Sequence, residues 1–222
     1  MSHNFPTNPI LGKIFRPDET VYIVAGGPSL KTFNWDFLSD KTSIAINKSL
    51  YKVPSAKVLW WSDERFFRSH RAAIESHKAS FKATAYISFY REQNPPWVNS
   101  YKFTKMRGYD ETPDSLCHGN NSGYAAIHLA IKTGAKKIVL LGYDFKFDED
   151  GSTHWHDGHH DENGRKFNHG EDSLTKNMLP NFKYLQIPAL QHGVEIINAN
   201  PESNLNIWPK RSLDDITNNQ SS

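Results

Sequence analysis

Short, strongly apolar runs alternate with longer amphipathic segments along this chain. Because the runs are apolar on both faces and end at glycine or at polar residues, they predict buried strands. The predicted strands span residues 20–26, 41–50, 56–64, 82–88, 136–145 and 194–200. Apolar residues at helical spacing predict helices between them, which span residues 66–81, 123–135 and 174–193, with another beginning at Ser29.

Strands that are apolar on both faces and alternate with helices are typical of a parallel sheet covered by helices. We therefore expect an α/β fold, Rossmann-like and doubly wound, with a mainly parallel sheet and helices on both faces. One domain should span residues 19–212, between an N-terminal arm at 1–18 and a flexible tail at 213–222. Proline residues predict irregular structure over 91–120. The polar stretch 146–170 is too long for an ordinary connection and predicts a mobile loop.

The composition suits a soluble globular protein and excludes several classes. The chain has 222 residues, enough for one α/β domain, and a formal net charge of only +2. No run of Lys and Arg predicts a nucleic-acid-binding stripe. The single cysteine, Cys117, excludes an internal disulfide and a cysteine-based zinc finger. Since neither a signal peptide nor a membrane-spanning segment is evident, we expect a cytoplasmic protein.

Polar or small residues follow most of the predicted strands. In an open parallel sheet, ligands bind beyond the carboxyl ends of the strands, so these residues are candidates for one binding site. They are Gly26, Gly27, Pro28 and Ser29 after the first strand, Asn47 after the second, Asp63 after the third, and Tyr143 and Asp144 after the strand at 136–145. The residues that begin the long helix should face the same crevice, and these are Asn121, Ser122 and Gly123.

The stretch VYIVAGGPSLK ends an apolar strand on two glycines, a proline and a serine. Glycine lets the backbone approach an anion closely because no Cβ intervenes. A helix that begins after Pro28 would direct N–H groups and the positive end of its dipole at that anion. The Asn-Ser-Gly start of the long helix has the same property, so the two segments together predict a seat for nucleotide phosphates. A plain turn and ordinary helix capping by Asn121 are the structural alternatives.

The loop at 148–164 carries four histidines among acidic residues, namely His154, His156, His159 and His160. Because imidazole and carboxylate groups bind divalent metals, these histidines are candidate metal ligands. Two other interpretations stay open: a solvated loop, and a lid that closes over substrate with Trp155 as a stacking surface. Just beyond the loop, His169 is a candidate general base that takes the proton of an attacking hydroxyl group.

Several catalytic motifs are missing from the sequence. It contains no GxSxG nucleophile motif and no Walker A sequence, and Cys117 lacks the signature of a thiol enzyme around it. The sequence therefore disfavours a serine hydrolase, a P-loop NTPase and a cysteine nucleophile.

Three ordered segments carry a resemblance to a known group of proteins: the strand that ends in GGPSLK, then IAINKS, then NSGYAAIHLAIKTGAKKIVLLGYDF. Together they resemble the small bacterial sialyltransferases that decorate lipooligosaccharide, and the wider group of GxGPSL proteins. That group, often phage-borne, includes flagellin-modifying glycosyltransferases, the motility accessory factors, and archaeal pterin pyrophosphokinases. The resemblance extends from Thr20 to Pro201, with residues 66–118 poorly matched, and implies a phage or prophage member.

The resemblance implies a Rossmann-like, metal-independent glycosyltransferase that binds a cytidine-nucleotide sugar and requires no cofactor. The residues that it implies at the nucleotide are Gly26, Gly27, Pro28, Ser29, Asn47 and the Asn121-Ser122-Gly123 segment. It also implies a histidine base in the segment before the last long helix. His169 is the best positional match for that base, with His159 and His160 as competitors.

This chain departs from the family pattern at three places. Gly26 replaces the usual asparagine of GNGPS, which removes a side-chain contact to the donor. Asp63 stands where the sialyltransferases tend to carry asparagine, and a carboxylate there would repel a phosphate but accept ribose hydroxyl groups. Tyr143 is the only nearby candidate for the tyrosine pair that serves the leaving phosphate in that family.

Three functions follow as hypotheses. The first is an inverting glycosyltransferase that transfers sugar from a CMP-sugar-like donor to a hydroxyl group of a glycan, a small molecule or a modified nucleic-acid base. The second is a nucleotide-dependent phosphotransferase with a divalent metal held by Asp63, Asp144 or the histidine-rich loop. The third is a non-catalytic nucleotide-binding protein. A homo-oligomer is compatible with each hypothesis.

Overall fold

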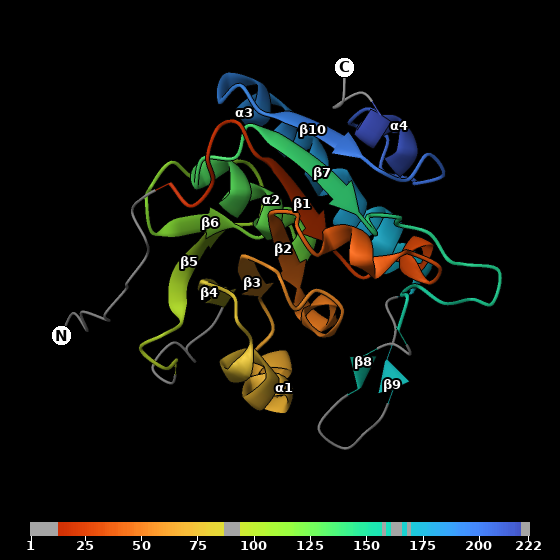
Figure 1. The fold of residues 1–222 in the computed structure, drawn as a ribbon. Coiled ribbons are helices and arrows are strands. Elements are labelled where there is room, and N and C mark those ends of the chain that lie inside the picture. Colours follow the sequence, from red (N-terminus) through yellow and green to blue (C-terminus); the bar gives the residue numbers. More distant parts are fainter. Residues whose placement is uncertain (1–12, 87–93, 157–158, 161–165, 168–169, 219–222) are drawn as a thin grey trace.

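The computed structural model of the chain describes residues 13–86, 94–156, 159–160, 166–167 and 170–218. Its centre is a sheet of eight strands in the order β10-β7-β1-β2-β3-β4-β5-β6, and every neighbouring pair is parallel (Figure 1). The strands are β1 (Thr20–Val24), β2 (Ser43–Ile46), β3 (Val58–Trp61), β4 (Phe81–Tyr86), β5 (Asn99–Lys105), β6 (Ser115–Cys117), β7 (Lys137–Leu141) and β10 (Glu195–Asn198). The fold is therefore the predicted α/β type.

Helices cover both faces of this sheet. The α-helices are α1 (Glu64–Ser76), α2 (Ser122–Lys132), α3 (Gln186–Gln191) and α4 (Leu213–Asn218). Short 3-10 helices span Pro28–Leu30, Trp35–Leu38, Asn47–Tyr51 and Leu179–Leu185, and a π-helical segment spans Ser173–Met178. Alternate strand residues point to opposite faces: Val21 and Ile23 pack in the apolar cluster that contains α2 and α3, whereas Tyr22 and Val24 pack in the one that contains α1 and α4.

The strand order reverses between β1 and β7. From β1 the chain builds the sheet outward through β2 to β6, and it then returns through α2 to add β7 and β10 on the other side of β1. Because the loops that follow β1 and β7 leave toward opposite faces, this reversal is where open α/β sheets bind ligands. The fold thus places the Gly26–Ser29 turn and Asp144 at the reversal point.

Two predictions of secondary structure are wrong. In place of a helix from Ser29, the chain forms separate 3-10 helices at Pro28–Leu30 and Trp35–Leu38, because Asn34 accepts a hydrogen bond from Asp36 N (3.2 Å) and starts the second one anew. The predicted irregular stretch over 91–120 contains β5 and β6. Most side chains of β5 are partly or fully exposed, so this strand lacks the apolar run that marks the central ones.

The predicted N-terminal arm and the predicted flexible tail both contain ordered structure next to the domain. Phe15 is buried, and the N–H groups of Ile14 and Phe15 both donate to Thr133 O (2.8 and 3.1 Å). Residues expected as a flexible tail form α4, which buries Ile216 in the cluster beneath α1. Within the predicted loop at 146–170, β8 (His159–His160) and β9 (Lys166–Phe167) pair antiparallel, apart from the main sheet (Figure 1).

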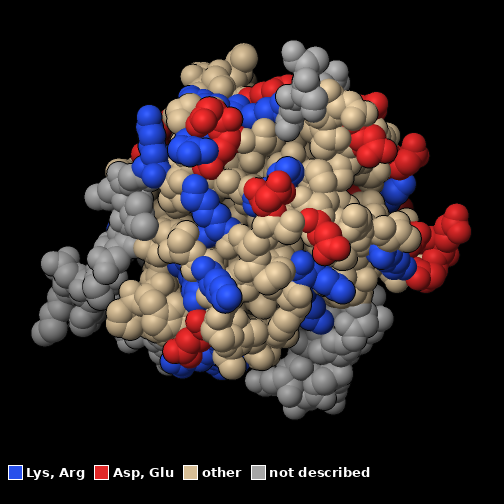
Figure 2. All heavy atoms as spheres, in the orientation of Figure 1, with Lys and Arg blue, Asp and Glu red and all other residues tan. Residues whose placement is uncertain are grey.

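The charges on one face and the composition of the helices bear on two expectations from the sequence. On the face drawn in Figure 2, basic and acidic side chains are interspersed rather than gathered into a stripe of one sign. None of the helices in the described part of the chain combines the length and the apolar composition that a membrane crossing needs.

Candidate functional site

Hydrogen bonds join the segments that follow β1, β2 and β3 at the carboxyl edge of the sheet. Ser49 Oγ, from the segment after β2, donates to Ala25 O at 2.9 Å. Trp60 Nε1, from β3, donates to Ser122 O at 3.0 Å, and the hydroxyl groups of Ser62 and Ser122 lie 2.5 Å apart. The start of α2 therefore lies against the end of β3, on the edge where the first two strands also end.

The turn after β1 is fastened to the segment after β7. Gly27 N donates to Gly142 O at 2.9 Å. Ser29 donates twice to the Asp144 carboxylate, through N and through Oγ, at 2.7 Å each. Asn200 Nδ2 donates to Asp144 Oδ1 at 2.7 Å, and Asp144 is only 1% exposed. The Asp144 carboxylate thus occupies the place that this turn was predicted to offer to a phosphate.

The start of α2 is satisfied in a similar way. Asn121 Oδ1 accepts hydrogen bonds from Gly123 N (2.7 Å) and Tyr124 N (3.2 Å), which is ordinary capping. Four of the N–H groups predicted to hold phosphate thus already have acceptors in the chain, namely those of Gly27, Ser29, Gly123 and Tyr124. In addition, the helix after Gly27 is only three residues long, Pro28–Leu30, so its dipole is small. These four N–H groups are therefore already hydrogen-bonded and are not free to hold a ligand anion in this conformation.

Tyr143 and Asp144 position the two segments relative to each other. These consecutive residues reach in opposite directions, since Asp144 holds Ser29 whereas the Tyr143 hydroxyl donates to Gly123 O at 3.0 Å. Tyr143 is 2% exposed, and burial raises the pKa of its hydroxyl group well above the usual value. Both side chains are therefore inside the protein, where they connect the segment after β7 to the turn after β1 and to the start of α2.

Asn47 is the candidate with the most unusual geometry. It follows β2 directly and has φ 50°, in the left-handed region that few residues other than glycine adopt. Its Oδ1 atom is buried and has no hydrogen-bond partner among the described residues. A buried acceptor without a partner costs about 1–3 kcal/mol, so both features point to a position kept for something other than stability.

Asp63 caps α1. Its carboxylate accepts from Arg65 N at 2.9 Å and forms an ion pair with the Arg65 guanidinium at 3.0 Å. The side chain is 40% exposed at the end of β3, so its outer surface stays open to solvent. The carboxylate that could repel a phosphate is thus partly neutralised by Arg65.

The segment Ser152–His156 lies over the turn after β1. Trp155 N donates to Gly26 O at 2.9 Å, and the imidazole rings of His154 and His156 stack with centroids 4.8 Å apart. A Cβ on Gly26 would lie 2.8 Å from His154 Cδ2, so the missing side chain makes room for this ring. Glycine at this position, where the resembling family carries asparagine, is thereby explained by the histidine above it.

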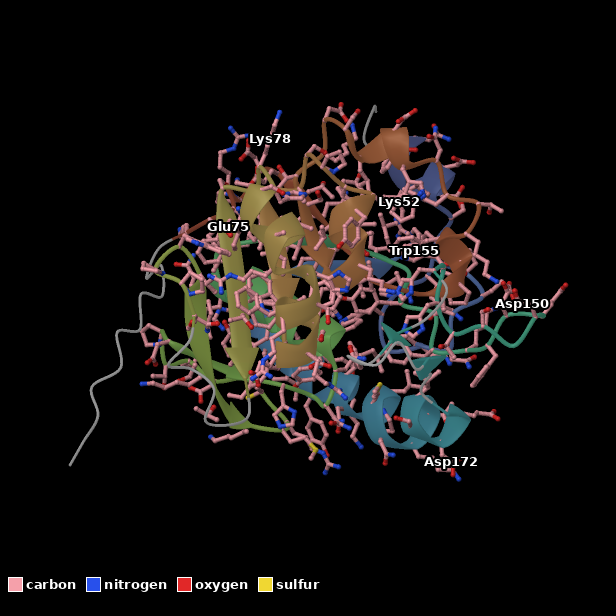
Figure 3. All side chains as sticks on the ribbon, turned by 90° about the horizontal axis from the view of Figure 1, so that it is seen from below. Lys52, Glu75, Lys78, Asp150, Trp155 and Asp172 are labelled. Atoms are coloured by element: carbon pink, nitrogen blue, oxygen red, sulfur yellow. The ribbon has the colours of Figure 1, made fainter. Side chains whose placement is uncertain are left out.

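Trp155 and Lys31 hold this segment in place. The Trp155 ring packs against Trp35 at 5.2 Å, and Lys52 lies over it, as Figure 3 shows. Lys31 pairs with Asp148 (2.9 Å) and with Asp150 (2.6 Å), further out along the same loop. These ion pairs raise the pKa of Lys31 and lower that of Asp150 to about 2. Residues 148–155 of the predicted mobile loop are thus fastened to the segment after β1.

The metal-site prediction has no support among the described residues, where no group of three or more His, Cys, Asp or Glu side chains lies close enough to hold an ion. Of the four loop histidines, His154 and His156 lie together, and His159 and His160 form β8. The candidate base His169 lies outside the described residues.

Sequence reasoning named most of the residues at this edge but missed how they meet. It did not foresee Asn200 beside Asp144, or His154 and His156 above Gly26. Two features of the sequence together could have indicated the second contact. One is glycine at position 26, where the resembling family carries asparagine, and the other is the His-Trp-His sequence at 154–156.

Comparison with known proteins gives one structural similarity. No family model matches the chain, and no curated protein does. A solved structure of a MAf glycosyltransferase from Magnetospirillum magneticum AMB-1 matches with a TM-score of 0.55 and 14% sequence identity. The match covers 93% of this chain and 35% of that chain, so the present chain spans about a third of its length. This similarity shows a shared fold.

Proposed function

We propose that the chain is a glycosyltransferase that uses a nucleotide-sugar donor, of the CMP-sugar type, and a hydroxyl acceptor. Three lines support the proposal: the fold shared with a MAf glycosyltransferase, the GGPSLK, IAINKS and NSGYAAIHLA segments, and the polar edge at the strand reversal. The observation that carries it is Asn47, whose unpaired, buried Oδ1 lies at the end of β2, beside that reversal.

In the proposed reaction the acceptor oxygen forms a bond to the anomeric carbon of the donor sugar, with inversion. The bond between that carbon and the donor phosphate breaks, and the nucleotide leaves with the electron pair. His169 accepts the acceptor proton, as a histidine base commonly does. Asn47, Ser122 and Gly26 would contact the nucleotide, while buried Asp144 and Tyr143 keep the surrounding segments in position. A glycan, a small molecule or a modified base is the proposed acceptor.

A thermal-shift panel of CMP-, UDP- and GDP-sugars at millimolar concentration tests the donor site. We expect a CMP-sugar to raise the melting temperature of the chain, because a ligand that binds only the folded state stabilises it. If no nucleotide sugar raises the melting temperature, the donor assignment is wrong.

The variant Asn47→Gly sharpens this test. Glycine adopts a φ of 50° without strain, so the fold should keep its stability within about 1 kcal/mol. The Asn47 side chain, however, is lost, and the CMP-sugar should raise the melting temperature less than it does in the wild-type protein. An undiminished shift would contradict a donor contact at Asn47.

The variant His169→Ala separates a transferase from a non-catalytic nucleotide-binding protein. This variant should bind the donor normally but lose catalytic turnover. A wild-type protein that binds the donor and shows no turnover would support the non-catalytic alternative.

The metal-dependent phosphotransferase has no specific observation in its favour, since Asp144 is enclosed by Ser29 and Asn200, and Asp63 is paired with Arg65. Loss of activity in EDTA would revive it.

A further inference from the structure

The helical stretch that precedes β10 has an apolar outer side. The chain is helical from Leu179 to Gln191, first as a 3-10 helix and then as α3. Its inner side packs in the core, where Phe182 and Leu185 are fully buried. Its outer side exposes three large apolar side chains, which are Tyr184, Ile187 and Leu190. A surface helix normally carries polar residues on the outer side, so this apolar row indicates that the side is covered by a partner.

Large apolar side chains are exposed at only one other place in the described part of the chain. Five such side chains are exposed there in all, and three of them form the row on the helix. The fourth, Met106, precedes Arg107, whose guanidinium group lies 5.5 Å from the centre of the Tyr184 ring. The fifth, Tyr51, ends the 3-10 helix after β2. Clustered apolar side chains on a surface mark an interaction site, whereas scattered ones are normal.

The segment 107–111, which runs beside this helix, carries opposite charges at its two ends. At one end, Arg107 Nε donates to Asn181 Oδ1 at 3.0 Å. At the other end, the Glu111 carboxylate lies 3.1 Å from His192 Nε2, just after α3 ends. Both charged side chains are exposed. Since a helix rises about 1.5 Å per residue, the eight residues from Tyr184 to His192 separate the two charges by about 12 Å along the helix.

Neighbouring charges keep the two ends opposite in sign. Lys183 lies over the Tyr184 ring and adds a second positive charge at the Arg107 end. At the Glu111 end, Glu195 is exposed at the start of β10, and Lys136 donates to His192 O. The surface is thus positive at the start of the row and mildly negative at its end.

Two copies of such a surface complement each other when their helices run antiparallel. In a two-fold dimer both copies use the same surface, and a two-fold axis perpendicular to the helix exchanges its two ends. Arg107 of each copy then faces Glu111 of the other, and the two apolar rows pack together. Parallel helices would instead place like charges opposite each other, which costs free energy. The formal net charge of +2 adds little repulsion between the copies.

We propose that two copies of this chain associate through this surface, with the rows Tyr184–Leu190 antiparallel and Arg107 paired with Glu111 across the interface. Tyrosine, methionine and arginine are enriched in interface cores, as here. Because one helix and one segment form a small interface, the dissociation constant should be on the order of 10 µM. Since α3 ends at the amino edge of the sheet, where β7 and β10 begin, and the candidate site lies at the carboxyl edge, the inference is independent of the proposed function (Figure 1).

Sedimentation velocity of the full chain, from about 1 to 500 µM, tests the proposal. The wild-type protein should shift from monomer to dimer over this range. Ile187→Glu should raise the dissociation constant at least about tenfold, because it places a charge at the centre of the apolar row. The side chain of Ile187 is 67% exposed, so the melting temperature of the monomer should hardly change. A wild-type protein that stays monomeric at the highest concentration would overturn the proposal.

Tyr51→Glu is the matched control, because it places the same charge on another exposed apolar residue, outside the row. This variant should dimerise as the wild type does, and an equal loss in both variants would overturn the proposal. If Ile187→Glu fails to fold, Leu190→Glu replaces it, since Leu190 is 79% exposed.

Charge reversal tests the antiparallel arrangement. Arg107→Glu and Glu111→Arg should each weaken the dimer severalfold, because each places like charges opposite each other across the two-fold axis. The double variant Arg107→Glu/Glu111→Arg restores opposite charges and should regain most of the lost affinity. A merely structural role of either residue would not produce this recovery, so a double variant that is no better than the single ones would overturn the proposal.

Discussion

Gly26 and Gly27 are neighbours in the sequence, yet they face opposite sides of the same turn. A Cβ on Gly27 would lie 2.5 Å from Gly142 O and nearer still to the Asp144 carboxylate, so backbone and a buried charge enclose it. For a Cβ on Gly26, the three nearest atoms among the described residues belong to the imidazole rings of His154 and His156. The fold requires one glycine at a place with no space for a side chain, and the other makes room for two imidazole rings.

The difference shows how the protein divides its polar groups. On the Gly27 side, acceptors inside the chain bind Gly27 N, Ser29 N and Ser29 Oγ, which fixes the turn against the segment after β7. On the Gly26 side the groups are half-buried side chains. If this division is correct, substitutions on the Gly27 side should reduce stability, and substitutions on the Gly26 side should reduce nucleotide affinity.

The largest expected effect belongs to Asp144→Ala. The substitution leaves Ser29 N–H and the Asn200 amide without their acceptor in a buried place, so we expect a loss of about 3 kcal/mol or more in the free energy of unfolding. Urea denaturation measures it. Asp63→Ala is the control, since this exposed cap should cost only about 1 kcal/mol. Similar losses for both variants would mean that the Asp144 junction is not special.

Gly27→Ala should have the next largest effect, a loss of about 1–3 kcal/mol in the free energy of unfolding. The neighbour in the way is the backbone carbonyl of Gly142, which cannot rotate aside as a side chain can. Thermal or urea unfolding of this variant is to be compared with that of Gly26→Ala. An unchanged stability of Gly27→Ala would contradict the close packing of the turn against the end of β7.

Asn121→Ala should cost about 1 kcal/mol, because Gly123 N and Tyr124 N lose the oxygen that caps α2. The released N–H groups would then be available to a ligand. CMP affinity should therefore not fall by more than the stability change explains. A large, selective loss of CMP affinity would show that Asn121 itself contacts the nucleotide.

Gly26→Ala should have the smallest effect on stability, below about 1 kcal/mol, because the atom in the way belongs to a His154 side chain that can rotate. Gly26 is a proposed nucleotide contact, so CMP affinity should fall although the protein stays folded. Calorimetry on the folded variant measures this, and an unchanged CMP affinity would contradict a nucleotide contact at Gly26.

The sequence predicted the architecture because the central strands are apolar on both faces. Strands β1, β2, β3 and β7 lie in the middle of the sheet, where a continuous apolar run is the only way to bury both sides. Strand β5 lies near the edge and fully buries only Tyr101 among its seven residues, so its composition did not distinguish it from a loop. Most of the sheet was thus predictable, and its far edge was not.

The candidate site was predicted in its residues but not in its contacts. Position after a strand end is a local property, which is why Gly26, Asn47 and Asp144 could be named. The pairing of Ser29 with Asp144 joins residues 115 positions apart, and the stacking of His154 above Gly26 is equally non-local. Whether an N–H group is already satisfied depends on such contacts, so the predicted amide seat for phosphate could not be checked without coordinates.

A crystal structure of the chain soaked with CMP tests the central claim most directly. The account predicts the nucleotide in contact with Asn47, Ser122 and Gly26, with the Asp144 carboxylate still hydrogen-bonded to Ser29. Phosphate seated on the N–H groups of Ser29 or Gly123, with the Asp144 or Asn121 side chain turned away, would contradict it.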